Sequence, residues 1–86
     1  MPESAGGIVL YERGGCHLCD EAREVLDAEI GPHRYRRVDI DADDDLVLRY
    51  GYRVPVITVN GEDRLEAPIS RPDLVSLLRA VDASEA

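Results

Sequence analysis

Both cysteines of the chain lie in one stretch, Arg13-Gly14-Gly15-Cys16-His17-Leu18-Cys19-Asp20, and have the spacing C-x-x-C. An apolar run at residues 8–11 precedes this stretch, and a segment with helical periodicity follows it. A close cysteine pair between a strand and a helix is typical of a thiol–disulfide redox site. We therefore expect Cys16 to lie at the N-terminus of a helix, with the rest of the chain holding it there.

The segment from His17 to Ile30 predicts an amphipathic helix. Asp20 and Glu21 in its first turn suit the positive end of the helix dipole, and Gly31-Pro32 is a typical helix ending. The apolar positions are spaced at three and four residues. They predict one buried stripe made of Leu18, Cys19, Ala22, Val25, Leu26 and Ile30.

The middle of the chain predicts an edge strand and a short helix. Residues 34–40 alternate weakly and carry charged side chains, which protect sheet edges. The acidic run 41–45 supplies an N-cap and a favourable first turn for a helix through Tyr50, and Gly51 ends it. We expect the inward side chains of this helix to be Leu46, Val47 and Tyr50.

The last third of the chain predicts a hairpin followed by a helix. Val54-Pro55 opens a strand at residues 54–59, where the missing N–H of a proline does no harm. Asn60-Gly61 is a strong hairpin signal, with residues 63–67 as the return strand. Ser70 is the expected N-cap of the final helix. The buried stripe of that helix should be Leu74, Leu77, Leu78 and Val81.

The resulting order of elements is β-α-β-α-β-β-α. It combines a parallel crossover pair of strands with a hairpin, which predicts an α/β fold with a four-stranded mixed sheet and helices on both faces. A chain of 86 residues makes one domain, residues 1–86. We expect the two ends, residues 1–6 and 82–86, to be frayed.

Charge and composition exclude several classes of function. Ten basic and 18 acidic residues give a net charge of −8, which disfavours binding to nucleic acid or to an anionic membrane. No apolar run approaches the ~20 residues of a membrane span. Residues 1–7 have neither the basic nor the apolar region of a signal peptide, so we expect a cytoplasmic protein. We also expect it to be a monomer. Without an export signal, a close cysteine pair is more often catalytic or metal-binding than structural.

Disulfide exchange needs a thiolate and a second thiol that resolves the mixed disulfide. Cys16 at a helix N-terminus would meet free backbone N–H groups and the positive dipole end, which lower the pKa of a thiol. We expect His17 and Arg13 to lower this pKa further, and the nearby acids to oppose them. Cys19, one turn later and deeper, is the expected resolving cysteine.

The order of elements, with C-x-x-C after the first strand and Val54-Pro55 opening the third, resembles the thioredoxin fold. The run from Leu10 to Ala22 is similar to small bacterial glutaredoxin-like proteins that carry a C-H-L-C site, and the similarity covers about residues 7–81. The resemblance implies a thiol–disulfide oxidoreductase in which Pro55 is cis and lies across from the Cys16 sulfur. It also implies that the Val54 backbone pairs with a bound substrate chain. Tyr52, just before Val54-Pro55, is a candidate to line the substrate site, and a plain core or rim position is the other interpretation of that side chain.

The chain departs from the glutaredoxin pattern at several positions. Glutaredoxins have proline and tyrosine between the cysteines, where this chain has His17 and Leu18, and Arg13 stands where they often carry lysine. Their segment for the glutathione carboxylate is replaced by residues 67–70, with Asp73 as a partial substitute. The buried acid of thioredoxins is replaced by Leu10. We expect no bound cofactor. The expected partners are a disulfide-containing protein or a glutathione mixed disulfide, with glutathione or a reductase as reductant.

Two alternatives from other classes stay open. The C-x-x-C pair could carry a metal or an iron–sulfur cluster across a dimer, although His17 and His33 are poorly placed to complete a four-ligand zinc site within one chain, so we predict no metal ligands there. The chain could also be a non-catalytic binding module on a redox fold. His17 as a plain surface residue is the other interpretation of that side chain.

Overall fold

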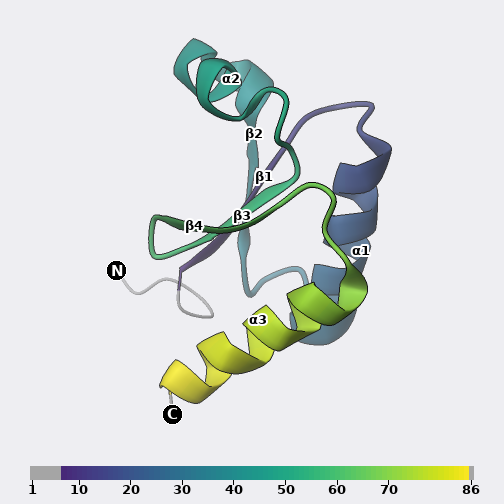
Figure 1. Ribbon diagram of the computed structural model, residues 1–86, viewed down its shortest axis with the longest axis vertical. Coiled ribbons are helices and arrows are strands. Elements are labelled where there is room, and N and C mark those ends of the chain that lie inside the picture. Colours follow the sequence, from purple (N-terminus) through teal and green to yellow (C-terminus); the bar gives the residue numbers. More distant parts are fainter. Residues whose placement is uncertain (1–6, 86) are drawn as a thin grey trace.

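The sheet is built around β1 (Ile8–Glu12), which lies between β2 (Arg36–Asp39) and β3 (Val56–Val59), with β4 (Glu62–Glu66) outside β3. β1 pairs in parallel with β2 and antiparallel with β3, and β3 pairs antiparallel with β4. This arrangement comes from a computed structural model that describes residues 7–85 (Figure 1). The predicted α/β fold with a four-stranded mixed sheet is confirmed.

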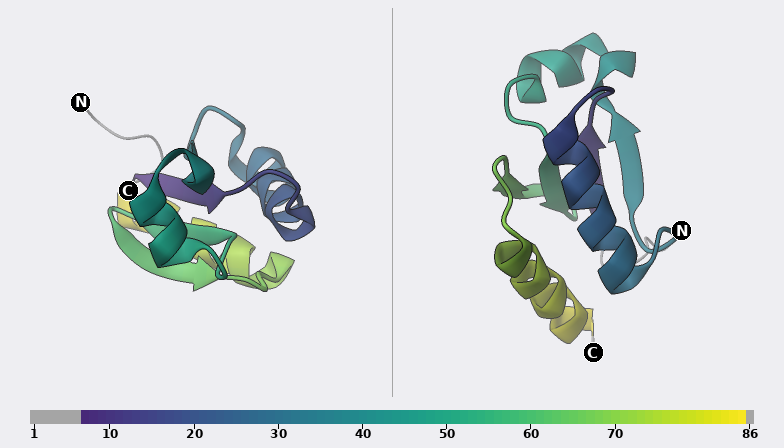
Figure 2. Two further views of the ribbon diagram at one scale, coloured as in Figure 1. Left: turned by 90° about the horizontal axis from the view of Figure 1, so that it is seen from above. Right: turned by 90° about the vertical axis from the view of Figure 1, so that its right-hand side faces the viewer.

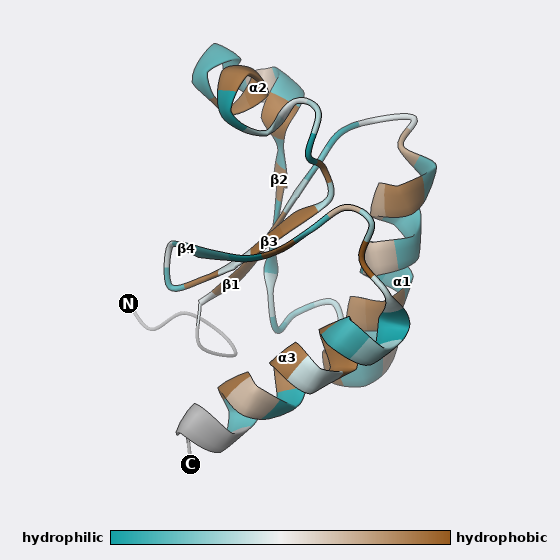
Figure 3. Cartoon of the chain, in the orientation of Figure 1, coloured by the Kyte–Doolittle hydropathy of each residue, from teal (hydrophilic) through white to brown (hydrophobic). Residues whose placement is uncertain are grey.

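The helices α1 (His17–Ile30) and α3 (Arg71–Glu85) cover one face of the sheet and pack against each other (Figure 2). α1 has the predicted bounds, and it ends at Gly31, whose positive φ of 87° suits glycine. Figure 3 shows that β3 is hydrophobic, whereas the edge strand β4 is hydrophilic. The core between sheet and helices is formed mainly by Ile8, Leu10, Ala22, Leu26, Ile57, Leu74, Leu77, Leu78 and Val81.

A second, smaller core lies on the other face, under α2 (Asp44–Tyr50). The 3₁₀ turn η2 (Ile40–Ala42) precedes α2, and Asp43 caps the helix by accepting a hydrogen bond from the Asp45 amide at 2.9 Å. The Tyr50 ring stacks on Tyr11 with 4.6 Å between centroids. This core contains Ile40, Tyr50 and Val56, with Tyr11, Leu46, Val47 and Val54 packed against it. The predicted helices on both faces are confirmed.

The predicted turn and cap of the last third are also confirmed. Asn60 and Gly61 both have positive φ, 53° and 85°, as the two-residue hairpin turn between β3 and β4 requires. The Ser70 hydroxyl accepts a hydrogen bond from the Asp73 amide at 3.1 Å. α3 continues to Glu85 and so includes residues 82–85, where we expect fraying, while residues 1–6 and 86 lie outside the described part.

Three local predictions need correction. Leu18, which we predict to be buried, is 44% exposed. The buried residues of α1 are Cys19, Ala22 and Leu26, and Leu18 lies beside this stripe and not within it. β3 begins at Val56, because the Val54 amide donates to the Tyr50 carbonyl at 3.1 Å instead of to the sheet. Tyr35, to which we assigned no core role, is buried and its hydroxyl donates to Asp27 at 2.6 Å.

Across residues 7–85, no helix combines the length and the hydrophobicity that crossing a bilayer requires.

Candidate functional site

Cys16 is the N-cap of α1. Its backbone is extended, with φ −100° and ψ 106°, and its Sγ accepts a hydrogen bond from the Cys19 amide at 3.1 Å. The sulfur thus occupies the place that a Ser or Asp oxygen takes in most helix caps, beside the N–H groups that have no partner within the helix. The predicted position of the pair at a helix N-terminus is confirmed.

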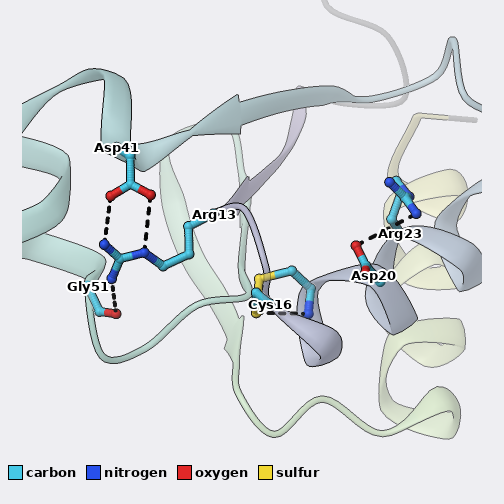
Figure 4. The surroundings of a disulfide bond; sticks show 7 residues. Arg13, Cys16, Asp20, Arg23, Asp41 and Gly51 are labelled. Carbon is cyan, nitrogen blue, oxygen red and sulfur yellow. Dashed lines mark hydrogen bonds and ion pairs between the residues drawn. A yellow bond between two sulfur atoms is a disulfide. The ribbon is translucent and has the colours of Figure 1, made fainter.

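Cys16 and Cys19 are joined by a disulfide, with 5.2 Å between their Cα atoms (Figure 4). The two residues are unequal in exposure: Cys16 is half-buried, whereas Cys19 is 0% exposed beneath the first turn of α1. An incoming reagent can therefore reach the first sulfur much more easily than the second. This asymmetry is the one that a nucleophile and a resolving cysteine need.

Arg13 is not directed at the cysteines. Its Nη2 and Nε donate to the Asp41 carboxylate at 2.6 and 3.3 Å, and its Nη1 donates to the Gly51 carbonyl at 3.2 Å. Figure 4 shows the guanidinium pointing toward these two residues and away from the Cys16 sulfur. The hydrogen bond and the charge of Asp41 raise the pKa of Arg13. This placement gives no support to a direct effect of Arg13 on the thiol.

His17 is also turned away, with 86% of its side chain exposed and its Nε2 at 2.8 Å from the Glu21 carboxylate. Asp20 has its own partner, Arg23, at 3.7 Å. The polar side chains of the first turn thus have partners along the helix surface. The backbone N–H groups and the helix dipole remain as the groups that act on the Cys16 sulfur.

The segment before β3 lies beside the first turn of α1 in all three orientations of Figures 1 and 2. Its Val54-Pro55 peptide bond is cis, as the family resemblance implied, and Pro55 is fully buried. The Val54 amide already donates to the Tyr50 carbonyl, so in this structure that N–H is not free for a substrate chain. Within the described chain, no backbone donor is bonded to the Val54 carbonyl, which is the group left to pair.

Tyr52 is fully exposed at the tip of the same segment. Arg53 holds the segment on its other side, with Nη2 at 2.9 Å from both Asp63 and Glu66 of β4. The guanidinium also lies over the Tyr50 ring, 5.3 Å from its centroid. A second cis bond, Ala67-Pro68, follows β4, where the Ala67 amide donates to the Arg53 carbonyl at 3.2 Å.

Glu12, for which we predict no role from its position in the sequence, lies next to this site. Glu12 ends β1 and is 8% exposed, and its carboxylate accepts a hydrogen bond from Arg37 Nε at 2.6 Å. With the cysteine loop and Asp20 it lines a cavity of about 200 Å³. The alternation of the strand could have indicated that Glu12 is buried, because Glu12 follows Ile8 and Leu10 at alternate positions and so shares their inward face.

No group of three or more His, Cys, Asp or Glu side chains among residues 7–85 is arranged to hold a metal ion.

The fold and the capped cysteine pair define a thioredoxin-fold protein with a redox-type C-x-x-C site. The chain belongs to the glutaredoxin-like domain family (DUF836), which it matches over residues 7–79. The predicted resemblance to glutaredoxin-like proteins is therefore confirmed.

Solved structures agree with this assignment. A structural-genomics target protein from X. campestris is 40% identical, with a TM-score of 0.72 over 86% of this chain and 97% of that one. A protein from Nitrosomonas europaea is 28% identical, with a TM-score of 0.60 over 83% and 88% of the two chains. Oxidized glutaredoxin 2 from Chlamydomonas reinhardtii shares the fold at 19% identity, with a TM-score of 0.57 over 95% and 79%.

Part of the chain also resembles insulin receptor substrate 4 from Homo sapiens, with 42% identity over 66 residues. The match covers 65% of this chain and spans only 5% of that protein. Because the match spans so little of insulin receptor substrate 4, it says nothing about the function of this chain.

Proposed function

We propose that this protein is a dithiol–disulfide oxidoreductase in which Cys16 is the nucleophile and Cys19 the resolving cysteine. The observation that carries the proposal is the Cys16 sulfur itself, which caps α1, accepts the Cys19 amide and is bonded to a fully buried partner sulfur. A thiolate formed at that cap is stabilised by the same N–H groups, and it is the thiolate that attacks disulfides.

The proposed cycle starts from the reduced protein. The Cys16 thiolate attacks one sulfur of a substrate disulfide, a new S–S bond forms, and the other substrate sulfur leaves as a thiolate that takes a proton from water. The Cys19 thiol then loses its proton and attacks Cys16 Sγ, which forms the Cys16–Cys19 disulfide and releases the second substrate thiol. The substrate gains two electrons and two protons, and the protein loses them. A thiol reductant, either glutathione or a reductase, returns the pair to the dithiol.

A disulfide-containing protein is the substrate that the surroundings favour. Among residues 7–85 no backbone donor is bonded to the Val54 carbonyl, and Leu18 and Tyr52 are exposed large hydrophobic side chains. A glutathione moiety has two carboxylates, and the nearby guanidinium groups of Arg13 and Arg53 are already bonded to Asp41, Asp63 and Glu66. Glutathione therefore enters the proposal as a reductant without a dedicated carboxylate site.

A turnover assay tests the proposal. Insulin disulfide reduction by the protein would be followed with glutathione plus glutathione reductase, and in parallel with thioredoxin reductase. We expect one of these systems to sustain turnover, and Cys16→Ser to abolish it. Turnover by Cys16→Ser at the rate of the unaltered protein would refute the assignment of the nucleophile.

Two rival functions have distinct outcomes in solution. A carrier of a metal or an iron–sulfur cluster across a dimer would show bound metal or visible absorption when purified without oxygen, and a doubled mass. A non-catalytic binding module would show a Cys16 pKa close to that of a free thiol.

A further inference from the structure

Arg13 joins the loop that carries Cys16 to the segment that carries Val54 and Pro55. Its guanidinium donates to the Asp41 carboxylate and, through Nη1, to the Gly51 carbonyl at 3.2 Å. Arg13 lies three residues before Cys16, and Gly51 lies three residues before Val54. One side chain therefore links the cysteine loop to the backbone of the segment that leads into β3 (Figure 4).

The two segments differ in how they are held. The segment 51–55 is fixed from the far side by Arg53 and by the amides that donate to the Tyr50 carbonyl. The cysteine loop contains Gly14 and Gly15, and a Cβ built on either would meet no atom within 4 Å. Across residues 7–85, the bond from Arg13 to Gly51 is the one side-chain hydrogen bond that joins residues 13–16 to residues 51–55.

We propose that Arg13 is a positioning residue that sets the Cys16 sulfur against the Val54-Pro55 segment. This inference rests on the proposed function, because its consequence is the geometry in which a substrate chain on that segment presents its disulfide. The guanidinium points away from the sulfur and its charge is balanced by Asp41. Arg13 therefore acts on the binding of a polypeptide disulfide and not on the ionisation of Cys16.

Two substitutions separate positioning from a direct electrostatic effect. Arg13→Gln removes the cation, whereas Asp41→Asn leaves the cation but removes the anion that holds it. If Arg13 acted on the thiolate by charge, the first change would raise the Cys16 pKa and the second would lower it. If Arg13 positions the loop, both changes weaken the same link, the first by removing the guanidinium and the second by removing the anion that orients it, so both shift KM in the same direction.

We expect Arg13→Gln, Asp41→Asn and the double variant each to raise KM for insulin disulfides by roughly 5- to 10-fold, the effect on an equilibrium of losing one hydrogen bond. kcat and the Cys16 pKa should stay unchanged. Arg13→Lys keeps the charge but lacks the planar fork whose separate nitrogens bond Asp41 and Gly51, so it should recover only part of the loss. Arg71→Gln, which breaks a surface ion pair with Glu29 away from the site, is the matched control and should leave KM unchanged.

Amide hydrogen exchange gives a readout that does not need turnover. In Arg13→Gln the Cys19 amide, which donates to the Cys16 sulfur, and the Asp20 amide, which donates to the Cys16 carbonyl, should exchange faster than in the unaltered protein and in Arg71→Gln. Unchanged exchange, or Cys16 pKa values that move in opposite directions in Arg13→Gln and Asp41→Asn, would overturn the positioning role. Failure of the unaltered protein to reduce any disulfide would refute the proposed function instead, and the exchange result would still decide the role of Arg13.

Discussion

The Cys16 sulfur accepts a hydrogen bond from the Cys19 amide at 3.1 Å, so one atom is both the cap of α1 and the proposed nucleophile. The geometry places this sulfur where the helix has its unpaired N–H groups. Serine or aspartate at such a position stabilises a helix because its oxygen accepts these protons. A thiolate accepts them more strongly than a thiol, since hydrogen bonds to an ionised acceptor are the stronger kind.

The first prediction follows from this contact. In the reduced protein the pKa of Cys16 should lie below the ~8.5 of a free thiol, because the N–H groups and the helix dipole favour the charged form. The pH dependence of alkylation by iodoacetamide measures it, with Cys19→Ser as the background so that only Cys16 titrates. His17→Gln should leave this pKa nearly unchanged, because the imidazole is exposed and bonded to Glu21. A Cys16 pKa equal to that of a free thiol would contradict stabilisation of the thiolate by the helix N-terminus.

A second prediction concerns Tyr52, whose side chain is fully exposed next to the cis Val54-Pro55 bond. Tyr52→Ala should raise KM for insulin disulfides several-fold, since it removes aromatic contact area, and should leave the free energy of unfolding within about 0.5 kcal/mol. Leu48→Ala is the matched control, because Leu48 is also a largely exposed hydrophobic side chain but belongs to α2. Equal KM values for the two variants would exclude Tyr52 from substrate binding.

A third prediction concerns the pair formed by Glu12 and Arg37. Arg37→Leu would leave the buried Glu12 carboxylate without its partner at 2.6 Å, which should lower the free energy of unfolding by about 1–2 kcal/mol. The expected loss of stability is small for a buried carboxylate, because half of the Arg37 side chain is exposed to water, which weakens the ion pair. Urea denaturation measures the loss. If adding Glu12→Leu to the Arg37→Leu variant restores the free energy of unfolding, the unpaired Glu12 charge is the cause of the loss.

A fourth prediction is the pH dependence that comes from Asp63. A hydrogen bond from Arg53 lowers the pKa of Asp63 below its ordinary 3.8, partial burial opposes this, and the Tyr50 hydroxyl adds to the lowering. A lowered folded-state pKa means that the stabilisation is complete above the ordinary value and is lost as the pH falls through the lower one. Asp63→Asn should therefore flatten the acid limb of the stability profile, and Asp44→Asn should not. An unaltered acid limb in Asp63→Asn would contradict the assignment.

Most of the fold could be predicted because its signals are local. The helical period from His17 to Ile30, the Asn60-Gly61 turn and the Ser70 cap each depend on a few neighbouring residues, and the structure shows all three. Leu18 was misplaced because a helical period with two adjacent apolar residues does not say which one points inward. The structure selects Cys19.

The candidate site could be predicted only in part, for a physical reason. The spacing C-x-x-C fixes the cysteines on one helical turn, so their placement follows from the sequence. The directions of Arg13 and His17 do not, because long or exposed side chains turn toward whatever acid the fold brings near. Asp41 is 28 residues from Arg13 and meets it only through the packing of η2 beside the cysteine loop. The same is true of Arg37, which pairs with Glu12 across two parallel strands.

The most direct test of the central claim is to trap the mixed disulfide. Reduced Cys19→Ser and reduced Cys16→Ser would each be mixed with a peptide that contains one disulfide, and the products would be analysed by intact-mass spectrometry under non-reducing conditions. We expect a stable adduct on Cys16 in the Cys19→Ser protein and none in the Cys16→Ser protein, because Cys19 is buried. An adduct that forms as readily on Cys19 as on Cys16 would contradict it.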